Sequence, residues 1–333
     1  MDNELLLFDR LNVIKDTINK YGEQNFYIAY SGGKDSTVLH HLIDMALPDN
    51  TIPRVYANTG IEYIAMVKHV HKQMEADNRI VEIRPQTNIK KVLEGNGYPF
   101  KSKRFSQAVE MYQRYHELCD EYLGAIERNK ELLNDYEYVH NLPKGVRFVV
   151  QEYYGVREKA EEKRTYITDE RSCPVRLRYL FTSKTNVKIS DECCNNMKEK
   201  PLRKWQKDNK KPYAIMGIMR DEGGRRSFAK CTVFSKGKLK SFSPLAVITK
   251  EWEEWFIKTY NIELCELYKE PYNFKRTGCK GCPFAVGLQD ELEVLQKYFP
   301  NERKQCEYIW KPVYGEYRRL DYRLTNDEQL KLF

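Results

Sequence analysis

The chain has 333 residues, 41% hydrophobic and 31% charged, with a formal net charge of +8, and this composition excludes a disordered or fibrous protein. No run approaches the roughly 20 consecutive apolar residues of a membrane span, and the N-terminus carries Asp2, Glu4 and Asp9 rather than a basic signal region. We therefore expect a packed cytoplasmic protein, without a membrane partner, that forms one large or two modest domains.

The first elements in chain order alternate between helix and strand. Residues 4–21 have helical periodicity, and residues 25–30 are a short apolar run with β-prone side chains. The segment Ser-Gly-Gly-Lys-Asp-Ser at 31–36 then leads into a new helical stripe over residues 37–45. We expect a glycine turn that links a buried strand to a helix.

Two further units repeat this alternation. Strands are expected over residues 53–57 and 79–83, each followed by a helix, over 61–74 and near 88–93. Strands that alternate with helices predict an α/β fold with a doubly wound parallel sheet.

The pattern changes after Gly95. Residues 105–138 read as a long, charged, Tyr-rich helix that does not belong to the sheet, so we predict a helical insertion at about residues 100–170. A late strand is expected over 214–218 and a hairpin over 230–242 that turns at Lys236-Gly237.

The last third of the chain is predicted to be mainly helical. A helix is expected over residues 250–260, and more helix follows it. We divide the chain into a nucleotide-binding domain, residues 1–250, and a C-terminal helical segment, residues 251–333, that contains a Cys-x-x-Cys pair.

The turn at residues 31–36 has the composition of an anion-binding loop. Small consecutive residues let the backbone approach a phosphate, while the N–H groups at the start of the next helix point at the anion. Lys34 adds a positive charge, Ser36 or Thr37 can donate a hydroxyl, and Asp35 could orient the loop or hold Mg²⁺. The spacing differs from that of the G-x-x-x-x-G-K-[ST] P-loop, and a glycine pair at such a turn can also be purely structural.

Residues 31–36 resemble the SGGxDS pyrophosphate loop of the adenine nucleotide α-hydrolase superfamily, which holds ATP pyrophosphatases and the PAPS reductase family. Residues 58–60 are similar to the family's Asp-Thr-Gly, with Asn58 in place of the acid. The resemblance implies a Rossmann-like fold that covers residues 20–285 apart from the insertion. The nucleotide-binding residues that it implies are Ser31, Gly32, Gly33, Lys34, Asp35, Ser36, Thr37, Asn58, Thr59 and Gly60.

A second segment, residues 217–226 (GIMRDEGGRR), is similar to the family's Gly-x-Arg-Arg-x-x-Ser-x-x-Arg stretch, although Met219 and Gly223 depart from it. Arg220 and Arg226 match, and their planar donor groups suit a grip on phosphate or sulfate. The alternative is that both are ordinary surface arginines. The residues expected to act in catalysis are Lys34, Asp35, Ser36, Arg220 and Arg226.

The nine cysteines include two close pairs. Cys193-Cys194 and Cys279-x-x-Cys282 are separated by 84 residues, and four thiolates in this arrangement can hold one iron-sulfur cluster. The pattern is similar to the [4Fe-4S] signature of adenylylsulfate reductases. A four-cysteine zinc site and reduced structural thiols are the alternatives.

The other cysteines are assigned no ligand role. Cys173 and Cys306 could replace one member of the adjacent pair or carry sulfur. Cys119, Cys231 and Cys265 are expected to be small buried side chains.

Positive charge is concentrated between residues 195 and 240. This block holds 14 Lys and Arg against 4 Asp and Glu, so its local charge of +10 exceeds that of the whole chain. It is either a surface for nucleic acid or polyphosphate or simply a solvated face.

Three functions remain open. The leading hypothesis is an ATP pyrophosphatase that activates a substrate for iron-sulfur-assisted sulfur transfer, similar to tRNA thiolases and to the sulfur-inserting member of DNA phosphorothioation systems. It would need ATP, Mg²⁺ and a sulfur donor protein. The alternatives are reduction of APS or PAPS with an electron donor protein, and a nucleotide-sensing regulatory or phage-conflict protein.

Reduction in this family uses a nucleophilic cysteine in a C-terminal Glu-Cys-Gly-Leu-His motif. Residues 1–333 contain no such motif, so a reductase would have to use Cys306 or Cys173 to attack sulfur.

Overall fold

The structure is a computed structural model that describes residues 2–158, 166–168, 173–182, 185–222 and 227–325. The chain divides into two compact units, each made of two segments. Unit 1 comprises Met1–Asn88 and Asn196–Lys280, and unit 2 comprises Ile89–Asn195 and Gly281–Phe333. The division into domains at residue 250 stays a prediction.

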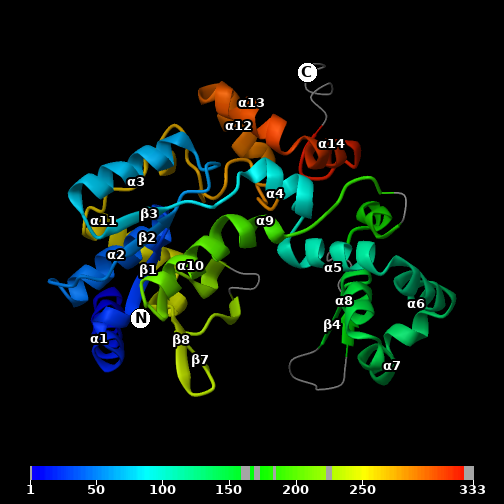
Figure 1. The fold of residues 1–333 in the computed structure, drawn as a ribbon, viewed down its shortest axis with the longest axis horizontal. Helices are drawn as coiled ribbons and strands as arrows, with labels where there is room; N and C mark the ends of the chain where they lie inside the picture. Colours follow the sequence, from blue (N-terminus) through cyan, green and yellow to red (C-terminus); the bar gives the residue numbers. More distant parts are fainter. Residues whose placement is uncertain (1, 159–165, 169–172, 183–184, 223–226, 326–333) are drawn as a thin grey trace. The chain divides into compact units, whose positions relative to one another are not determined.

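Unit 1 contains a six-stranded sheet with the strand order β3-β2-β1-β6-β8-β7 (Figure 1). β1 pairs in parallel with β2 and β6, β3 with β2, and β8 with β6. This confirms the predicted α/β fold with a parallel sheet; one edge strand, β7, is antiparallel to β8. The strands are β1 Phe26–Tyr30, β2 Arg54–Ala57, β3 Ile80–Ile83, β6 Tyr213–Met216, β7 Thr232–Ser235 and β8 Lys238–Phe242.

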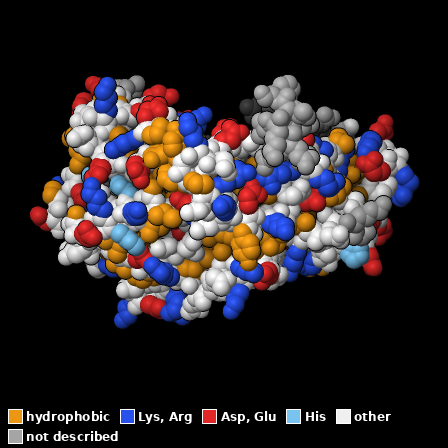
Figure 2. Space-filling view, turned by 90° about the horizontal axis from the view of Figure 1, so that it is seen from above, with side chains coloured by type: hydrophobic (Ala, Val, Ile, Leu, Met, Phe, Trp, Pro, Cys, Tyr) orange, Lys and Arg blue, Asp and Glu red, His pale blue; other side chains and the backbone are white. Residues whose placement is uncertain are grey.

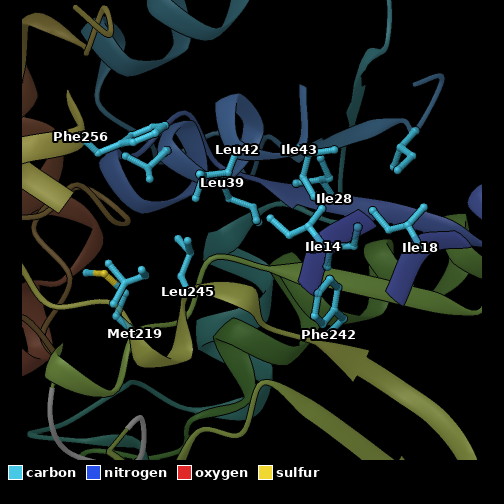
Figure 3. Packing of buried hydrophobic residues seen from close by; sticks show 14 of the residues in the cluster. Ile14, Ile18, Ile28, Leu39, Leu42, Ile43, Met219, Phe242, Leu245 and Phe256 are labelled. Atoms are coloured by element: carbon cyan, nitrogen blue, oxygen red, sulfur yellow. The ribbon is translucent and has the colours of Figure 1, made fainter. Parts of the chain in front are cut away.

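Helices pack on both faces of this sheet. Ile28 of β1 belongs to a core that receives Ile14 from α1, Leu42 from α2 and Phe256 from α11 (Figure 3). Since neighbouring side chains of a strand point to opposite faces, Tyr27 lies on the other side, where its ring is 5.5 Å from that of Trp205 in α10. The helices of unit 1 are α1 Asn3–Tyr21, α2 Lys34–Ala46, α3 Ile64–Ala76, α10 Lys200–Asp208 and α11 Lys250–Thr259.

Local signals set several of these boundaries. Asp2 caps α1 by accepting a hydrogen bond from the Glu4 amide at 3.0 Å, and Thr249 caps α11 through the Trp252 amide at 3.3 Å. The hairpin turns where expected, because Lys236 and Gly237 have φ angles of 51° and 76°, as a two-residue hairpin turn requires.

Unit 2 contains the predicted insertion, in which α8 packs against α5, α6 and α7 (Figure 1). The single long helix expected over residues 105–138 is wrong, because three α-helices and a short 3₁₀ helix occupy this stretch. Tyr115 leaves the helical conformation with φ −131° and ψ 40°, and the Asp135 side chain caps a new helix through the Tyr138 amide at 3.0 Å.

The elements of unit 2 are α4 Ile89–Asn96, α5 Lys103–Arg114, α6 His116–Arg128, α7 Tyr136–Asn141, α8 Lys144–Tyr153, β4 Val156–Glu158, β5 Tyr166–Thr168, α9 Glu192–Cys194, α12 Leu288–Tyr298, α13 Pro300–Ile309 and α14 Lys311–Arg319. β4 and β5 form a separate antiparallel pair. The described residues also form the 3₁₀ helices η1 Glu23–Asn25, η2 Lys130–Leu133, η4 Val175–Phe181, η6 Arg220–Glu222, η8 Pro244–Val247 and η9 Glu266–Tyr268 and the π turn η5 Asn195–Glu199. Across the described residues, no helix combines the length and the apolar character needed to cross a membrane.

Candidate functional site

Three predicted segments meet at one edge of the sheet in unit 1. Residues 31–36 follow β1, residues 58–60 follow β2 and residues 217–222 follow β6, and β1 is the parallel neighbour of both other strands. A Cβ atom placed on Gly217 would lie 3.0 Å from the carbonyl oxygen of Asp35, so the third segment touches the first. This is the edge at which open parallel sheets bind ligands.

The loop conformation requires glycine at its second position. Gly32 has a φ of 71°, and an added Cβ would lie 2.4 Å from Cγ2 of Val70 and 2.9 Å from Sδ of Met66 in α3. Gly33 adopts an extended conformation, with a φ of −73° and a ψ of 163°, and is the N-cap that precedes α2. The loop therefore fits closely between β1 and α3, with the N-terminus of α2 directly behind it.

The loop hydroxyls hold this conformation. Ser36 Oγ donates to the Gly33 carbonyl oxygen at 2.9 Å and accepts from the Ser31 amide at 3.2 Å. Thr37 Oγ1 donates to the same carbonyl oxygen at 3.0 Å. Both hydroxyls thus have structural partners in the described chain, whatever ligand the loop binds.

The Lys34 ammonium lies 2.9 Å from Oε2 of Glu253, a residue of α11 whose side chain is 0% exposed. Burial, and then the negative charge of Asp35, raises the pKa of Glu253 to about 7, while Lys34 lowers it. Sequence reasoning missed Glu253, because nothing in the pattern of α11 marks a glutamate that turns inward.

Tyr268 is a second residue that the sequence did not reveal. The Lys34 amide donates to its hydroxyl at 3.2 Å, and the same hydroxyl contacts Thr277 Oγ1. A phenol oxygen therefore occupies one of the N–H positions at the start of α2 that a bound anion would use.

The segment after β2 is held by its own polar contacts. Asn58 is buried, and its Oδ1 accepts from the Gly60 amide at 3.0 Å while its Nδ2 donates to Glu82 at 3.3 Å. Thr59 donates to Glu62 through its amide at 2.9 Å and its hydroxyl at 2.8 Å. The buried carboxylate of Glu62, which the sequence did not single out, thus fixes the turn.

Of the two predicted clamp residues, Arg220 lies among the described residues. Arg220 is exposed, and its Nε donates to the carbonyl oxygen of Ala229 at 2.5 Å. Arg226 lies outside the described residues. Their role as phosphate or sulfate clamps stays a prediction.

The predicted cluster cysteines are distributed over both units. In unit 1, Cys279 is half-buried and forms an antiparallel bridge with Glu62, next to a hydrogen bond of 2.7 Å from the Lys280 amide to the Ile61 carbonyl oxygen. Cys279 is therefore adjacent to the turn after β2. In unit 2, Cys193 is buried in α9, and Cys194 and Cys282 are half-buried.

Cys306 lies beside the Cys-x-x-Cys turn within unit 2. Gly281 has a φ of 60°, and an added Cβ would lie 2.7 Å from the Cys306 Sγ and 2.5 Å from the Tyr314 hydroxyl oxygen. Glycine at this position therefore lets the completely buried Cys306 approach the turn.

Burial raises the pKa of the Cys119 and Cys173 thiols to about 11 and about 12, and it also raises the pKa of Cys265. Such thiols stay protonated and are poor nucleophiles. Cys231, expected to be buried, is half-buried and packs against the core, with its sulfur 3.9 Å from Nη1 of Arg10.

The cysteine side chains have the chemistry that an iron-sulfur cluster requires. No disulfide joins any of the nine, all of which the structure describes, and thiolates are the usual cluster ligands. A buried hydroxyl without a hydrogen-bond partner in the described chain, that of Tyr56, also lies in unit 1. The thiol chemistry of these side chains thus suits the group, and the assignment of Cys193, Cys194, Cys279 and Cys282 as its ligands stays a prediction.

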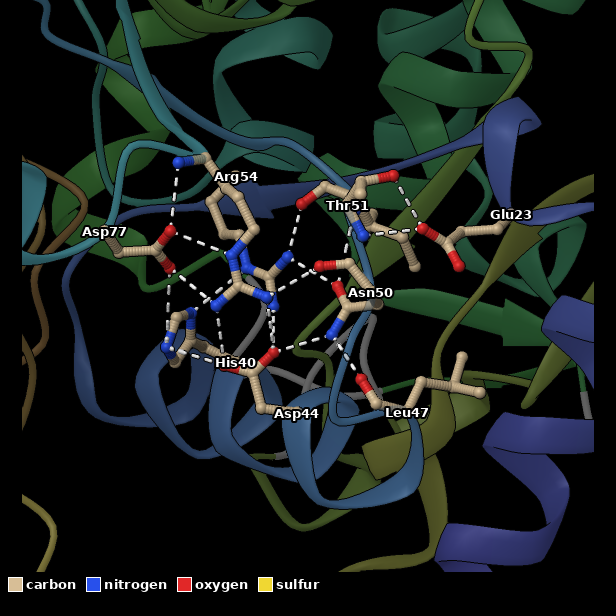
Figure 4. A network of polar contacts seen from close by, with 10 residues as sticks. Glu23, His40, Asp44, Leu47, Asn50, Thr51, Arg54 and Asp77 are labelled. Carbon is tan, nitrogen blue, oxygen red and sulfur yellow. Dashed lines mark hydrogen bonds and ion pairs between the residues drawn. The ribbon is translucent and has the colours of Figure 1, made fainter.

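A group of His40, Asp44 and Asp77 has the spacing of a metal site, with ligand atoms within 4.8 Å of one another. Two arginines neutralise it. Arg54 donates to Asp44 at 2.5 Å (Figure 4), and Arg79 donates to Asp77 at 2.8 Å. The group lies at the amino end of β2, away from the edge that carries residues 58–60. We interpret it as a structural ion-pair network.

The parallel sheet and the glycine loop between β1 and α2 define a Rossmann-like α/β protein. The family model described as phosphoadenosine phosphosulfate reductase domain matches residues 25–139 and 146–285, and the chain belongs to this family. The matched ranges include much of the helical insertion, which we had expected to lie outside the resemblance.

Among solved structures, the chain is similar to the U34-tRNA thiolase NcsA from Methanococcus maripaludis with its [4Fe-4S] cluster. The identity is 14%, the TM-score is 0.35, and the match covers 96% of this chain and 80% of that one. No curated protein matches the sequence.

Proposed function

We propose that this chain is an ATP pyrophosphatase that activates a substrate for iron-sulfur-assisted sulfur transfer onto nucleic acid. One observation carries the proposal: the loop at residues 31–36 and a predicted cluster cysteine belong to the same edge of one sheet. Cys279 bridges to Glu62, Glu62 holds Thr59, and Thr59 follows β2, the parallel neighbour of β1.

The loop would bind the phosphates of ATP, with residues 58–60 near the adenosine. The N–H groups at the start of α2 stabilise negative charge on a leaving pyrophosphate, as donors aimed at developing charge do in other enzymes. Asp35 is the residue we assign to Mg²⁺. Lys34, already paired with Glu253, would keep its charge beside the loop.

Cys193, Cys194, Cys279 and Cys282 would hold the [4Fe-4S] cluster. When bound, such a cluster supplies an iron atom that can carry sulfur to the activated substrate. Three of these side chains are half-buried, so they are within reach of incoming iron and sulfide. A cytoplasmic protein, whose thiols stay reduced, suits this ligand set.

The burial of Cys173 and Cys306 supports sulfur transfer over reduction of APS or PAPS. A reductase needs a thiolate that can reach sulfur, but Cys173 and Cys306 are 1% and 0% exposed. A sulfur donor protein is therefore the proposed partner, in place of an electron donor.

Nucleic acid is the acceptor that the charge distribution favours. Residues 195–240 carry the local charge of +10, and Arg203, Lys204 and Lys207 of α10 are exposed. Phosphate backbones bind such surfaces without regard to sequence. On the face drawn in Figure 2, basic side chains are interspersed with acidic and hydrophobic ones.

The test is anaerobic incubation of the reconstituted protein with ATP, Mg²⁺ and nucleic acid. We expect release of pyrophosphate and, with a sulfide source, thiolated nucleosides in the digested product. Sulfite formed from APS or PAPS with thioredoxin would instead show a reductase. Nucleotide binding without either product would favour a sensor and contradict the proposal.

A further inference from the structure

Two hydroxyl groups of unit 1 lie against the loop at residues 31–36. A Cβ atom placed on Gly33 would lie 3.3 Å from the Tyr268 hydroxyl oxygen and 3.5 Å from Thr277 Oγ1. The Tyr268 hydroxyl accepts the amide N–H of Lys34 at 3.2 Å. Lys34 is the first residue of α2, and the first amides of a helix have no partner within it. The phenol therefore reaches the part of the loop at which an anion would bind.

The two hydroxyls together have one proton more than their own hydrogen bonds use. The Tyr268 hydroxyl contacts Thr277 Oγ1, and a hydrogen bond between them takes the proton of one of the two groups. The Lys34 amide supplies its own proton to the phenol oxygen. In the part of the chain that the structure describes, neither hydroxyl makes a further hydrogen bond. One O–H group is therefore a donor that a ligand at the loop can use.

The acidity of the two groups decides which of them donates to an anion. A phenol is a stronger acid than an aliphatic alcohol, so it is the better donor to a negatively charged oxygen. In that arrangement Thr277 donates to Tyr268, and Tyr268 donates to the anion. Hydrogen bonds in such a chain strengthen one another, because each polarises the next.

The turn that carries Tyr268 is held on the side away from the loop. The Tyr268 amide donates to the Cys265 carbonyl oxygen at 3.0 Å. The Phe274 amide donates to the Leu267 carbonyl oxygen at 2.8 Å, and both of these side chains are buried. The Phe274 ring also packs edge-on against Tyr63, with the ring centroids 5.0 Å apart. We therefore expect the phenol to stay beside the loop and to share the site with a bound anion.

We propose that Tyr268 is a ligand-binding residue: its hydroxyl donates a hydrogen bond to a phosphate oxygen of the bound nucleotide, and Thr277 orients that hydroxyl. The inference rests on the proposed function, since it takes the nucleotide to be ATP. It extends the phosphate site from the loop to a residue 234 positions after Lys34.

The test compares Tyr268→Phe with the control Tyr260→Phe, which alters an exposed tyrosine at the end of α11. Calorimetric titration with ATP and Mg²⁺, and separately with inorganic pyrophosphate, measures the affinities. We expect Tyr268→Phe to bind both ligands about tenfold more weakly, because a hydrogen bond to a charged oxygen is lost. The control should bind both like wild type.

Thr277→Val tests the orienting role of the second hydroxyl. It should weaken ATP binding about two- to threefold in the wild-type background. In the Tyr268→Phe background it should change nothing, because Thr277 acts through the phenol. Equal losses in the two backgrounds would contradict this role.

The direction of the change distinguishes a phenol that binds the ligand from one that must leave before an anion binds. In the second case, Tyr268→Phe should bind ATP more tightly than wild type, and this result would overturn the inference. Unchanged affinity would also overturn it, while the proposed function would stand. Wild-type protein that binds APS without binding ATP would contradict the proposed function, and the same titrations with APS then decide the role of Tyr268. Protein that binds neither nucleotide would remove both.

Discussion

At the scale of single residues, the site depends on a few side chains whose environment is unusual. Glu253 is a completely buried acid that pairs with Lys34, and Gly32 occupies a position that no side chain can share. Gly32 is part of the loop, and Glu253 reaches the loop from α11. Each makes a separate prediction.

Replacing Glu253 by Gln should impair the loop without unfolding the protein. The neutral amide binds the Lys34 ammonium more weakly than the carboxylate does. The ammonium would then no longer be held in one position beside the loop. We expect ATP-dependent pyrophosphate release to fall about tenfold, or about 1.4 kcal/mol in the barrier, with AMP binding unchanged. Steady-state pyrophosphate assays and calorimetric titration measure the two quantities.

Glu251→Gln is the matched control, since Glu251 is an exposed acid of the same helix. It should behave as wild type. Equal losses in both variants would show that α11, and not the ion pair of Glu253, is responsible.

Gly32→Ala should destabilise the protein and abolish nucleotide binding. Alanine is disfavoured at a φ of 71°, and its Cβ would lie 2.4 Å from Val70 Cγ2. We expect a loss of about 1–3 kcal/mol in the free energy of unfolding, measured by urea denaturation. Gly95→Ala, in α4 with nothing within 4 Å of its added Cβ, should instead stabilise. A variant Gly32→Ala that melts and binds like wild type would contradict this account of the loop.

At the scale of elements, β2 is anchored at its amino end and leads into the candidate site at its carboxyl end. Its amino end is held by the ion pair of Arg54 with Asp44, beside His40 and Asp77 (Figure 4), whereas its carboxyl end leads into residues 58–60. The network ties β2 to α2, because Asp44 and His40 belong to that helix. It thereby fixes the strand whose other end carries the candidate site.

The network also predicts how stability depends on pH. Burial, then the positive charge of Arg54, lowers the pKa of His40 to about 4, against about 6.5 in the unfolded chain. Asp44, Asp77 and His41 also act on His40, the two acids in the opposite direction. Because the unfolded state binds the proton more readily, this stability is present above pH 6.5 and is lost as the pH falls toward 4.

Urea denaturation between pH 7 and pH 4 measures this effect. His40→Gln should flatten the decline in the free energy of unfolding over that window. His140→Gln, at an exposed position of α7, should leave the decline unchanged. A steep decline that persists in His40→Gln would assign the pH dependence to other groups.

At the scale of the whole molecule, the charge is strongly asymmetric. Residues 195–240 hold more positive charge than the entire chain, so the remainder is slightly acidic. A nucleic acid should therefore bind through this block and be repelled elsewhere. The strength of binding should depend steeply on salt.

Lys204→Gln combined with Lys207→Gln should reduce the salt dependence of nucleic-acid binding. Each lysine that neutralises a phosphate contributes about 0.9 to the slope of log K against log salt, so the slope should fall by about 2. Lys15→Gln with Lys20→Gln, two exposed lysines of α1, is the control and should change nothing. Fluorescence anisotropy at several salt concentrations would detect an unchanged slope, which would exclude α10 as the binding surface.

The sequence by itself determined the order of the elements and the place of the loop, because these signals are local. Alternating strand and helix patterns predicted β1, β2 and β3 close to their observed bounds, and glycines at residues 32 and 33 marked the turn. It also predicted the hairpin, whose turn at Lys236-Gly237 depends on two adjacent residues. Periodicity missed the break at Tyr115, since helical side chains continue on both sides of it.

Only the tertiary structure decided which ordinary residues join the site. Glu253, Tyr268 and Glu62 carry no motif. Their roles depend on burial and on partners up to 234 positions away, as between Lys34 and Tyr268. A charge or a hydroxyl acquires its function here because packing removes water from it, and packing is a property of the folded chain.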